Sequence, residues 1–126
     1  MKNSQRRARH LASVSHDDLG EHATVVTLKG TFDLANAEGL GNSMTSAFDR
    51  GPGPVVLDLS AVDWLDSAAI AVLVLVARRG LALDRTIGLV RPKDAIWEGI
   101  EALNLDSLFL VFQTRDEAAH HPAIAS

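Results

Sequence analysis

The segment 54–59, with the sequence PVVLDL, constrains the fold of this chain more than any other. Its apolar side chains would point to both sides of a strand, a pattern typical of a central strand in a parallel sheet. The next apolar run, residues 68–77, is ten residues long. A membrane-spanning helix needs about twenty such residues, so this run predicts a buried helix instead, over residues 67–79 and ending at Gly80. A strand, a short loop and a helix are therefore expected in this order.

The remaining segments alternate between strand-like and helix-like patterns. A first strand at residues 9–15, a turn at 16–20 and a second strand at 23–29, ended by Gly30, predict a hairpin. Helices are expected at residues 35–50, stopped by the GPGP sequence at 51–54, and from Pro92 to about residue 104. The second of these should bury Ile96, Ile100 and Leu103 on one face. Further strands are predicted at 85–91 and 108–113.

A capping box marks the last element. Thr114 and Glu117 have the spacing at which two side chains satisfy free N–H groups at a helix start, and the helix should stop before Pro122. The full order, β-β-α-β-α-β-α-β-α, predicts a single α/β domain. It should have a mostly parallel twisted sheet, an N-terminal antiparallel edge strand and about four helices.

The charges are distributed unevenly along the chain. The net charge is −4, but residues 1–10 carry four positive charges, and the remaining residues have a net charge of −8. An acidic body repels phosphate backbones, so no nucleic-acid binding is expected. There is no secretory signal, no stretch for membrane insertion and no cysteine, which together favour a cytoplasmic protein.

Asp66 and Ser67 open the predicted helix at 67–79. Either side chain can cap the helix by accepting a hydrogen bond from a free N–H group, and a structural cap alone would explain them. The position also suits a phosphorylation switch, because a phosphate there gains from the helix dipole and need not unfold the domain. It would add about −1.5 to −2 of charge beside Asp63 and Asp66, and so repel a partner surface built for a neutral serine.

Three short motifs carry a resemblance to a known family. The sequences LDLS at 57–60 and WLDS at 64–67 resemble the strand end and helix start of STAS domains, and GTFD at 30–33 resembles the Gly-x-x-Asp of the same family. Asp33 and Ser67 stand about 34 residues apart, and the element order also matches. The resemblance implies a STAS-type domain at residues 9–121. A flexible basic tail at 1–8 would precede it, and a C-terminal tail at 122–126 would follow.

The resemblance is to the anti-sigma factor antagonist type, which regulates transcription by partner switching. There, an anti-sigma factor serine kinase binds the unphosphorylated antagonist, and releases it when the antagonist's serine is phosphorylated; a serine phosphatase resets the switch. The family often has a second Ser or Thr and then Gly after this serine, where this chain has Ala68 and Ala69. Carried over, Ser67 is the phosphorylation site, and the partner-binding residues are Asp33, Asn36, Asp66, Ser67, Ala68 and Ala69.

Other functions stay open at this point. A STAS subunit of a lipid-transport ABC complex, which braces the ATPase subunit, is the main alternative because such subunits have a similar Asp-Ser followed by Ala. A small-ligand or nucleotide sensor is a third class, with no motif in its favour. The N-terminal edge strand would also allow a weak homodimer.

No motif predicts an enzyme, a catalytic residue, a metal site or a cofactor. There is no GxSxG elbow and no phosphate-binding glycine loop. The carboxylates of Asp58, Asp63 and Asp66 are interpreted as caps and solvated groups. The histidines lack metal-binding spacing; they are His10, His16, His22, His120 and His121.

The two tryptophans are both interpreted as core residues, because large aromatic side chains bury most of their area. Trp64 is expected to pack partly into the core. Trp97 is expected to pack beside Ile96 and Ile100, with partial exposure and a contact role as its alternative.

Overall fold

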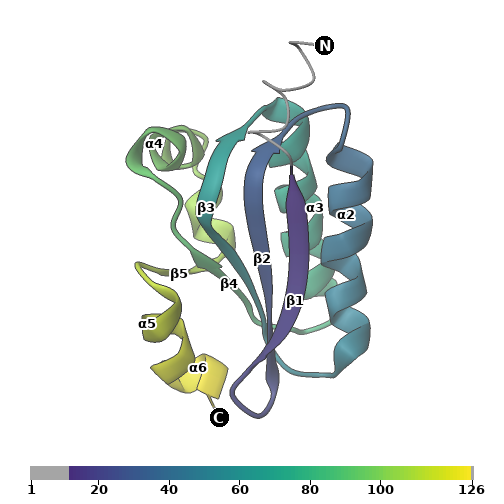
Figure 1. Cartoon of the computed structure of the whole chain (residues 1–126). Coiled ribbons are helices and arrows are strands. Elements are labelled where there is room, and N and C mark those ends of the chain that lie inside the picture. The colour runs from purple at the N-terminus through teal and green to yellow at the C-terminus, as the bar shows by residue number, and fades with distance from the viewer. Residues whose placement is uncertain (1–11, 126) are drawn as a thin grey trace.

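The computed structural model describes residues 12–125 (Figure 1). The strands are β1 (Ser13–Leu19), β2 (Ala23–Phe32), β3 (Val55–Leu65), β4 (Ile87–Val90) and β5 (Leu110–Phe112). The helices are α2 (Ala37–Ser46), α3 (Ser67–Ala82), α4 (Asp94–Ala102), α5 (Arg115–His120) and α6 (Pro122–Ala125), with 3₁₀ turns η1 (Ala47–Arg50) and η2 (Leu105–Leu108). The predicted α/β class is confirmed. The expected tail at residues 1–8 lies outside the described residues.

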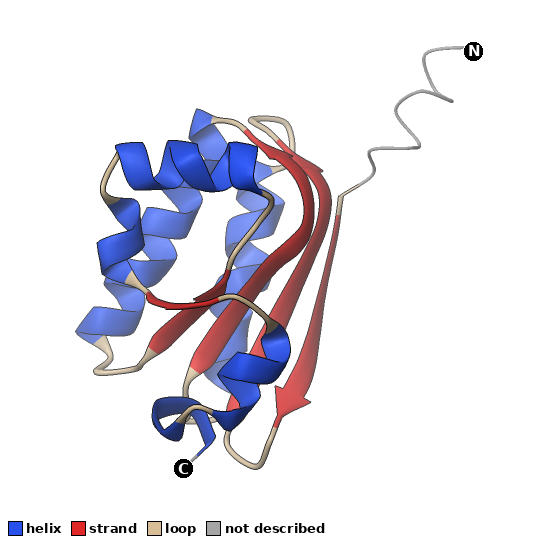
Figure 2. Cartoon of the chain, turned by 90° about the vertical axis from the view of Figure 1, so that its left-hand side faces the viewer, coloured by secondary structure: helices blue, strands red, loops and turns tan. Residues whose placement is uncertain are grey.

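The sheet keeps the strand order of the chain, β1-β2-β3-β4-β5. β1 runs antiparallel to β2, and the other neighbouring strands are parallel. Parallel strands are joined by right-handed crossovers, and because the strand order never reverses, α2, α3 and α4 all fall on one face of the sheet. The opposite face receives only α5 and α6, which follow the last strand and cover one part of it (Figure 2). One end of that face is therefore left open.

The larger core lies between the sheet and the helices α2, α3 and α4. It is built from the inward side chains of the strands, such as Leu28 and Leu57, and from helical residues such as Leu73. Trp97 of α4 belongs to it and is only 5% exposed, so its predicted packing in the core is confirmed. The guanidinium of Arg91 lies over its ring, 4.9 Å from the ring centroid.

The smaller core, on the other face, corrects the expectation of a C-terminal tail at residues 122–126. α5 ends at His120 as predicted, but Pro122–Ala125 form α6. Ile124 is 1% exposed and packs in a cluster with Phe112 and Ala118. The reason is physical: α5 alone is six residues long, and without α6 the apolar side chains of this face would remain in water.

The first strand lies further along the chain than predicted. Residues 16–20 were expected as a turn, but β1 continues through Leu19, which pairs with Ala23. The polar side chains of His16, Asp17 and Asp18 are compatible with a strand because β1 is at the edge of the sheet and its outward side chains meet water. The start of the predicted strand at 9–15 lies outside the described residues, except for 12–15.

The central strand β3 also extends beyond its prediction, through the residues expected as a loop, to Leu65. β2 likewise continues past Gly30, which has a φ of 94°. Two register shifts between these strands each insert one extra residue into β3, near Ser60 and at Asp63. The second shift breaks the alternation, so that Val62 and Leu65 both face the core. Trp64 is turned outward and is 54% exposed, which corrects its predicted core packing.

Two helix ends differ from their predictions. Gly80 was expected to end α3, but the helix runs to Ala82. Gly80 is required by close packing, since a Cβ atom there would lie 2.5 Å from Cδ1 of Ile87. Leu103 was expected on the buried face of α4, but it follows the last helical residue and is exposed. The chain then reverses at Asn104, whose φ is 58°.

The GPGP turn at residues 51–54 is held by a side chain that the sequence did not single out. The guanidinium of Arg85 donates hydrogen bonds to the carbonyl oxygens of Phe48 (3.2 Å), Gly51 (2.5 Å) and Gly53 (2.7 Å). It also lies over the Phe48 ring, 5.3 Å from its centroid. Arg85 therefore fixes the turn that leads from η1 into β3. Because Arg85 lies in the connection before β4, this strand begins only at Ile87, two residues later than predicted.

Candidate functional site

The N-terminus of α3 is built around Asp66. Its Oδ1 accepts a hydrogen bond from the backbone N–H of Ala69 (3.0 Å), as an N-cap does. Its Oδ2 accepts one from the N–H of Leu34 (3.0 Å), in the loop between β2 and α2. One carboxylate thus joins two segments that lie 32 residues apart in the sequence. Asp66 is confirmed as a cap, and in addition it fixes the neighbouring loop.

The loop between β2 and α2 is ordered by its own polar side chains. Asp33 Oδ1 accepts from the N–H of Ala35 (3.0 Å). Asn36 Oδ1 accepts from the N–H of Asp33 (2.8 Å), and Asn36 Nδ2 donates to the carbonyl of Thr31 (3.0 Å). Asp33 and Asn36 therefore shape the loop that Asp66 holds against α3. The structure brings together the predicted residues of both motifs.

Ser67 is the first residue of α3 and is exposed. Its hydroxyl group makes no hydrogen bond to any residue between 12 and 125. The first N–H groups of a helix have no acceptor within it. Asp66 accepts from the N–H groups of Ala69 and Ile70, through its side chain and its carbonyl, which leaves those of Ser67 and Ala68. A phosphate on Ser67 would find both a helix N-terminus and free donors.

Ala68 and Ala69 differ in what they offer to a partner. Ala68 is half-buried beside Ser67. Ala69 is buried in the larger core, so its methyl group points away from the surface. It takes part in the site through its N–H group, which Asp66 holds.

The three carboxylates in β3 and directly after it have separate roles. Asp58 is buried and accepts hydrogen bonds from Arg115 Nε (2.9 Å) and from the Ser60 hydroxyl (2.7 Å). Asp63 lies 3.6 Å from Nζ of Lys93, and Asp66 caps α3. Within the described residues, no group of three acidic or histidine side chains could hold a metal ion. The predicted cap is confirmed for Asp66, and the Asp63 side chain is partly solvated as predicted. Asp58, however, is buried and paired with Arg115, which corrects its interpretation as a cap or solvated group.

The sequence did not predict that two large apolar side chains near Ser67 are exposed. Leu34, whose N–H group is bound to Asp66, is 78% exposed. Trp64 stands three residues before Ser67 and is also exposed, because of the register shift at Asp63. Exposed aromatic and aliphatic side chains around a polar centre are typical of protein interfaces. The register shift gives no sequence signal of its own, but the Trp-x-x-Ser spacing puts the indole near the helix start.

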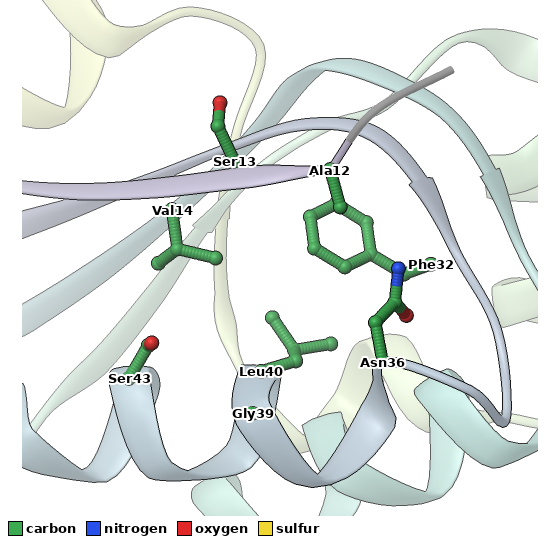
Figure 3. Close-up of a pocket in the computed structure, with 8 residues that line it drawn as sticks. All are labelled: Ala12, Ser13, Val14, Phe32, Asn36, Gly39, Leu40 and Ser43. Carbon is green, nitrogen blue, oxygen red and sulfur yellow. The ribbon is translucent and has the colours of Figure 1, made fainter. Parts of the chain in front are cut away.

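A shallow groove of about 260 Å³ runs beside the Asp33 loop, between β1 and α2 (Figure 3). The side chains of Phe32, Leu40 and Val14 form its apolar floor, and Asn36 lies at one end. No charged side chain lines it among the described residues. Such a lining does not fit a nucleotide, whose phosphates need cations or free N–H groups.

We expect Asp66→Ala to lower the free energy of unfolding by about 1–2 kcal/mol, because it removes an N-cap and leaves the N–H of Leu34 without its acceptor. Asp66→Asn should lower the free energy of unfolding by less than about half of that amount, since an amide oxygen can still accept a hydrogen bond from the N–H of Ala69. Urea denaturation of both variants measures the difference. Equal losses in the two would contradict the capping role.

None of the helices in the described part of the chain is long and apolar enough to cross a membrane. The described histidines contact other protein groups. His16 Nε2, for example, lies 2.6 Å from the carbonyl oxygen of Ser43, and His121 packs edge-on against Phe112.

Comparison with known proteins adds to this geometry. The family model described as the STAS domain matches residues 14–118. A Bordetella bronchiseptica protein, BtrV, named as a candidate anti-sigma factor antagonist, is 33% identical over 95 residues, which are 75% of this chain and 82% of that protein.

Solved structures share the fold. An anti-sigma factor antagonist from Mycobacterium paratuberculosis has a TM-score of 0.70 and 24% identity, over 85% of this chain and 90% of that one. SpoIIAA of Bacillus in its phosphorylated form has a TM-score of 0.63 and 14% identity, over 82% of this chain and 95% of that one.

Proposed function

The chain belongs to the STAS domain family, and from this we propose that it is an anti-sigma factor antagonist in which Ser67 is the phosphorylated residue. In its unphosphorylated form it binds an anti-sigma factor serine kinase, and phosphorylation of Ser67 releases that partner. A serine phosphatase returns it to the binding form.

The observation that carries this proposal is the state of Ser67. Its hydroxyl group is exposed, free of hydrogen bonds to the described residues, and placed at the start of a 16-residue helix. A kinase can reach such a hydroxyl without unfolding the protein. The exposed Leu34 beside it supplies apolar surface for a partner.

A phosphate at this position would act on the interface and leave the fold intact. It would carry about −1.5 to −2 of charge at a helix N-terminus that stabilises anions. The same charge would stand beside the carboxylate of Asp66, which already occupies the Leu34 and Ala69 donors. A partner that packs against a neutral Ser67 would therefore have to bury a dianion, which costs binding free energy.

The relatives support the proposed role. BtrV is named as a candidate anti-sigma factor antagonist, and SpoIIAA has been described in both unphosphorylated and phosphorylated forms. The alternative, a STAS subunit of a lipid-transport ABC complex, is not favoured, because the names of these relatives refer to anti-sigma factor antagonists. A binding protein of this kind needs no catalytic residue and no cofactor.

Isolation of the protein from its native cell, with its partners, tests the proposal. Mass spectrometry should find phosphate on Ser67 in one fraction of the protein, and a kinase-type anti-sigma factor bound mainly to the other fraction. Unmodified Ser67 in a stable complex with transporter subunits would overturn the proposal and restore the alternative.

A further inference from the structure

The open end of the sheet carries an exposed aromatic side chain beside an unpaired cation. Paired residues on neighbouring strands point to the same side of a sheet. Lys29 pairs with Ala61, and Thr31 pairs with Trp64, so the four side chains share the face opposite α2 and α3. We call these four residues the Trp64 surface. None of them contributes to the two hydrophobic cores.

The topology explains why this surface is uncovered. The crossover helices all lie on the other face, and α5 and α6 reach the residues around Val25, Val56 and Phe112 at the far end of the strands (Figure 2). The side chains between the Trp64 surface and the sheet edge are small and polar, as at Ser13 and Ser15 of β1. The indole is therefore the one large apolar side chain among these described residues of the open face.

The surface is continuous with the Ser67 site. Trp64 lies two residues before Asp66, and the carbonyl of its strand partner Thr31, near the end of β2, accepts a hydrogen bond from Asn36 in the loop that Asp66 also holds. Leu34 and Trp64 thus flank the start of α3, one from the helix side and one from the open face of the sheet. A protein that covers Ser67 would meet both.

The charges at this surface indicate the chemistry of its partner. Lys29 is exposed and forms no ion pair with the residues of the described range, whereas Lys93 is already paired with Asp63. Residues 11–126 have a net charge of −8, so Lys29 places a positive charge on this surface of an otherwise acidic domain. A complementary surface would offer a carboxylate to Lys29 and an apolar pocket to the indole, the arrangement in which aromatic residues contribute most to binding.

We propose that the Trp64 surface is a second part of the anti-sigma factor interface. The indole of Trp64 inserts into an apolar pocket of the partner, and an Asp or Glu at the border of that pocket pairs with Lys29. The inference rests on the function proposed above and extends it, because it adds a contact that does not depend on the phosphorylation state of Ser67. Trp64 anchors the complex, and Lys29 steers its formation.

The test uses the anti-sigma factor recovered with the unmodified protein, with isothermal titration for the affinities and stopped-flow mixing for the association rates of purified variants. We expect Trp64→Ala to weaken binding about 30-fold, as for an anchor residue. Lys29→Glu should slow association about tenfold at low salt, and less at high salt. The control is Leu81→Ala, which shortens an 80% exposed leucine at the other end of α3. The affinity of this variant should stay within about twofold of that of the wild type, because most truncations outside an interface centre change affinity little.

A second measurement does not depend on substitutions. With 5-fluorotryptophan the chain gives two fluorine resonances, one from buried Trp97 and one from Trp64. The unlabelled anti-sigma factor should shift the Trp64 resonance and leave that of Trp97 in place.

The outcomes separate this inference from the proposed function. If Trp64→Ala binds with unchanged affinity and the Trp64 resonance does not shift, the second contact is wrong. The phosphorylation switch would still be supported if a negative charge at Ser67 abolishes binding. If no form of the protein binds an anti-sigma factor, both proposals are wrong.

Discussion

Gly53→Ala should lower the free energy of unfolding by about 2–3 kcal/mol and the melting temperature by about 10 °C. A Cβ atom at Gly53 would overlap the carbonyl oxygen of His22 and lie 2.7 Å from its carbonyl carbon. Both are backbone atoms of the β1–β2 turn, so no side-chain rotation can relieve the contact. The Gly53 carbonyl is held from another direction by Arg85 Nε (2.7 Å), so the chain cannot move away without weakening that bond.

The matched control is Gly51→Ala, two residues earlier in the same turn. Nothing lies within 4 Å of a Cβ atom at Gly51, and its φ of 169° is extended backbone that alanine adopts readily. Arg85 binds the Gly51 carbonyl as well, so both variants test the same turn. Thermal and urea denaturation should show Gly51→Ala within about 0.5 kcal/mol of the wild type. Similar stabilities for the two variants would mean that the turn does not pack against His22 as described.

Ser67→Glu should weaken binding to the anti-sigma factor by about 10- to 100-fold, since a like charge or a buried unpaired charge costs at least about 1.4–2.8 kcal/mol in an interface. The same change places a negative charge in the first turn of α3, which has no acidic residue of its own. The helix dipole should therefore keep the stability of the fold equal to or slightly above that of the wild type. A titration and an unfolding curve on the same sample distinguish a lost interface from a damaged fold.

Two variants serve as controls for this prediction. Ser67→Ala removes the phosphorylation site without adding charge, and it should bind at least as tightly as the wild type in the presence of ATP and kinase. Ser107→Glu adds the same charge at an exposed serine in η2, outside the set of residues proposed for the interface, and should leave affinity unchanged. Equal binding by Ser67→Glu and Ser107→Glu would refute the switch.

Much of the fold could be predicted because its signals are local. The continuous apolar run of β3, the β-branched residues of β2 and the Thr114 cap of α5 each follow from a short segment; the cap is present, with Glu117 N–H donating to Thr114 Oγ1 (3.0 Å). The misplaced ends depend on distant contacts. Gly80 lies inside α3 because Ile87 packs against it, and the chain end folds as α6 because Ile124 completes a core.

The sequence predicts which residues form the candidate site, but it does not predict how their side chains are arranged. Asp33, Asp66 and Ser67 follow from the motifs and Asn36 from the loop that the resemblance implies, and the structure brings Asp33, Asn36 and Asp66 together. That Asp66 also binds the N–H of Leu34 depends on the packing of two loops, which no single segment encodes. The exposure of Trp64 depends on the extra residue at Asp63, and counting alternate residues from Val62 places the indole on the wrong face.

The strand order of this sheet also has a consequence for how the protein is made. Each strand pairs with the one synthesised just before it, so no part of the sheet has to wait for a distant segment. Sequence-near contacts of this kind favour rapid folding, and domains can fold from the N-terminus while translation continues. The segment that must wait is the last one: until α5 and α6 leave the ribosome, Phe112 and its neighbours on that face stay uncovered. Chains arrested once Val90 has emerged from the ribosome should already resist proteolysis within β2 and β3, and cleavage there would show that the sheet forms only at a later stage of synthesis.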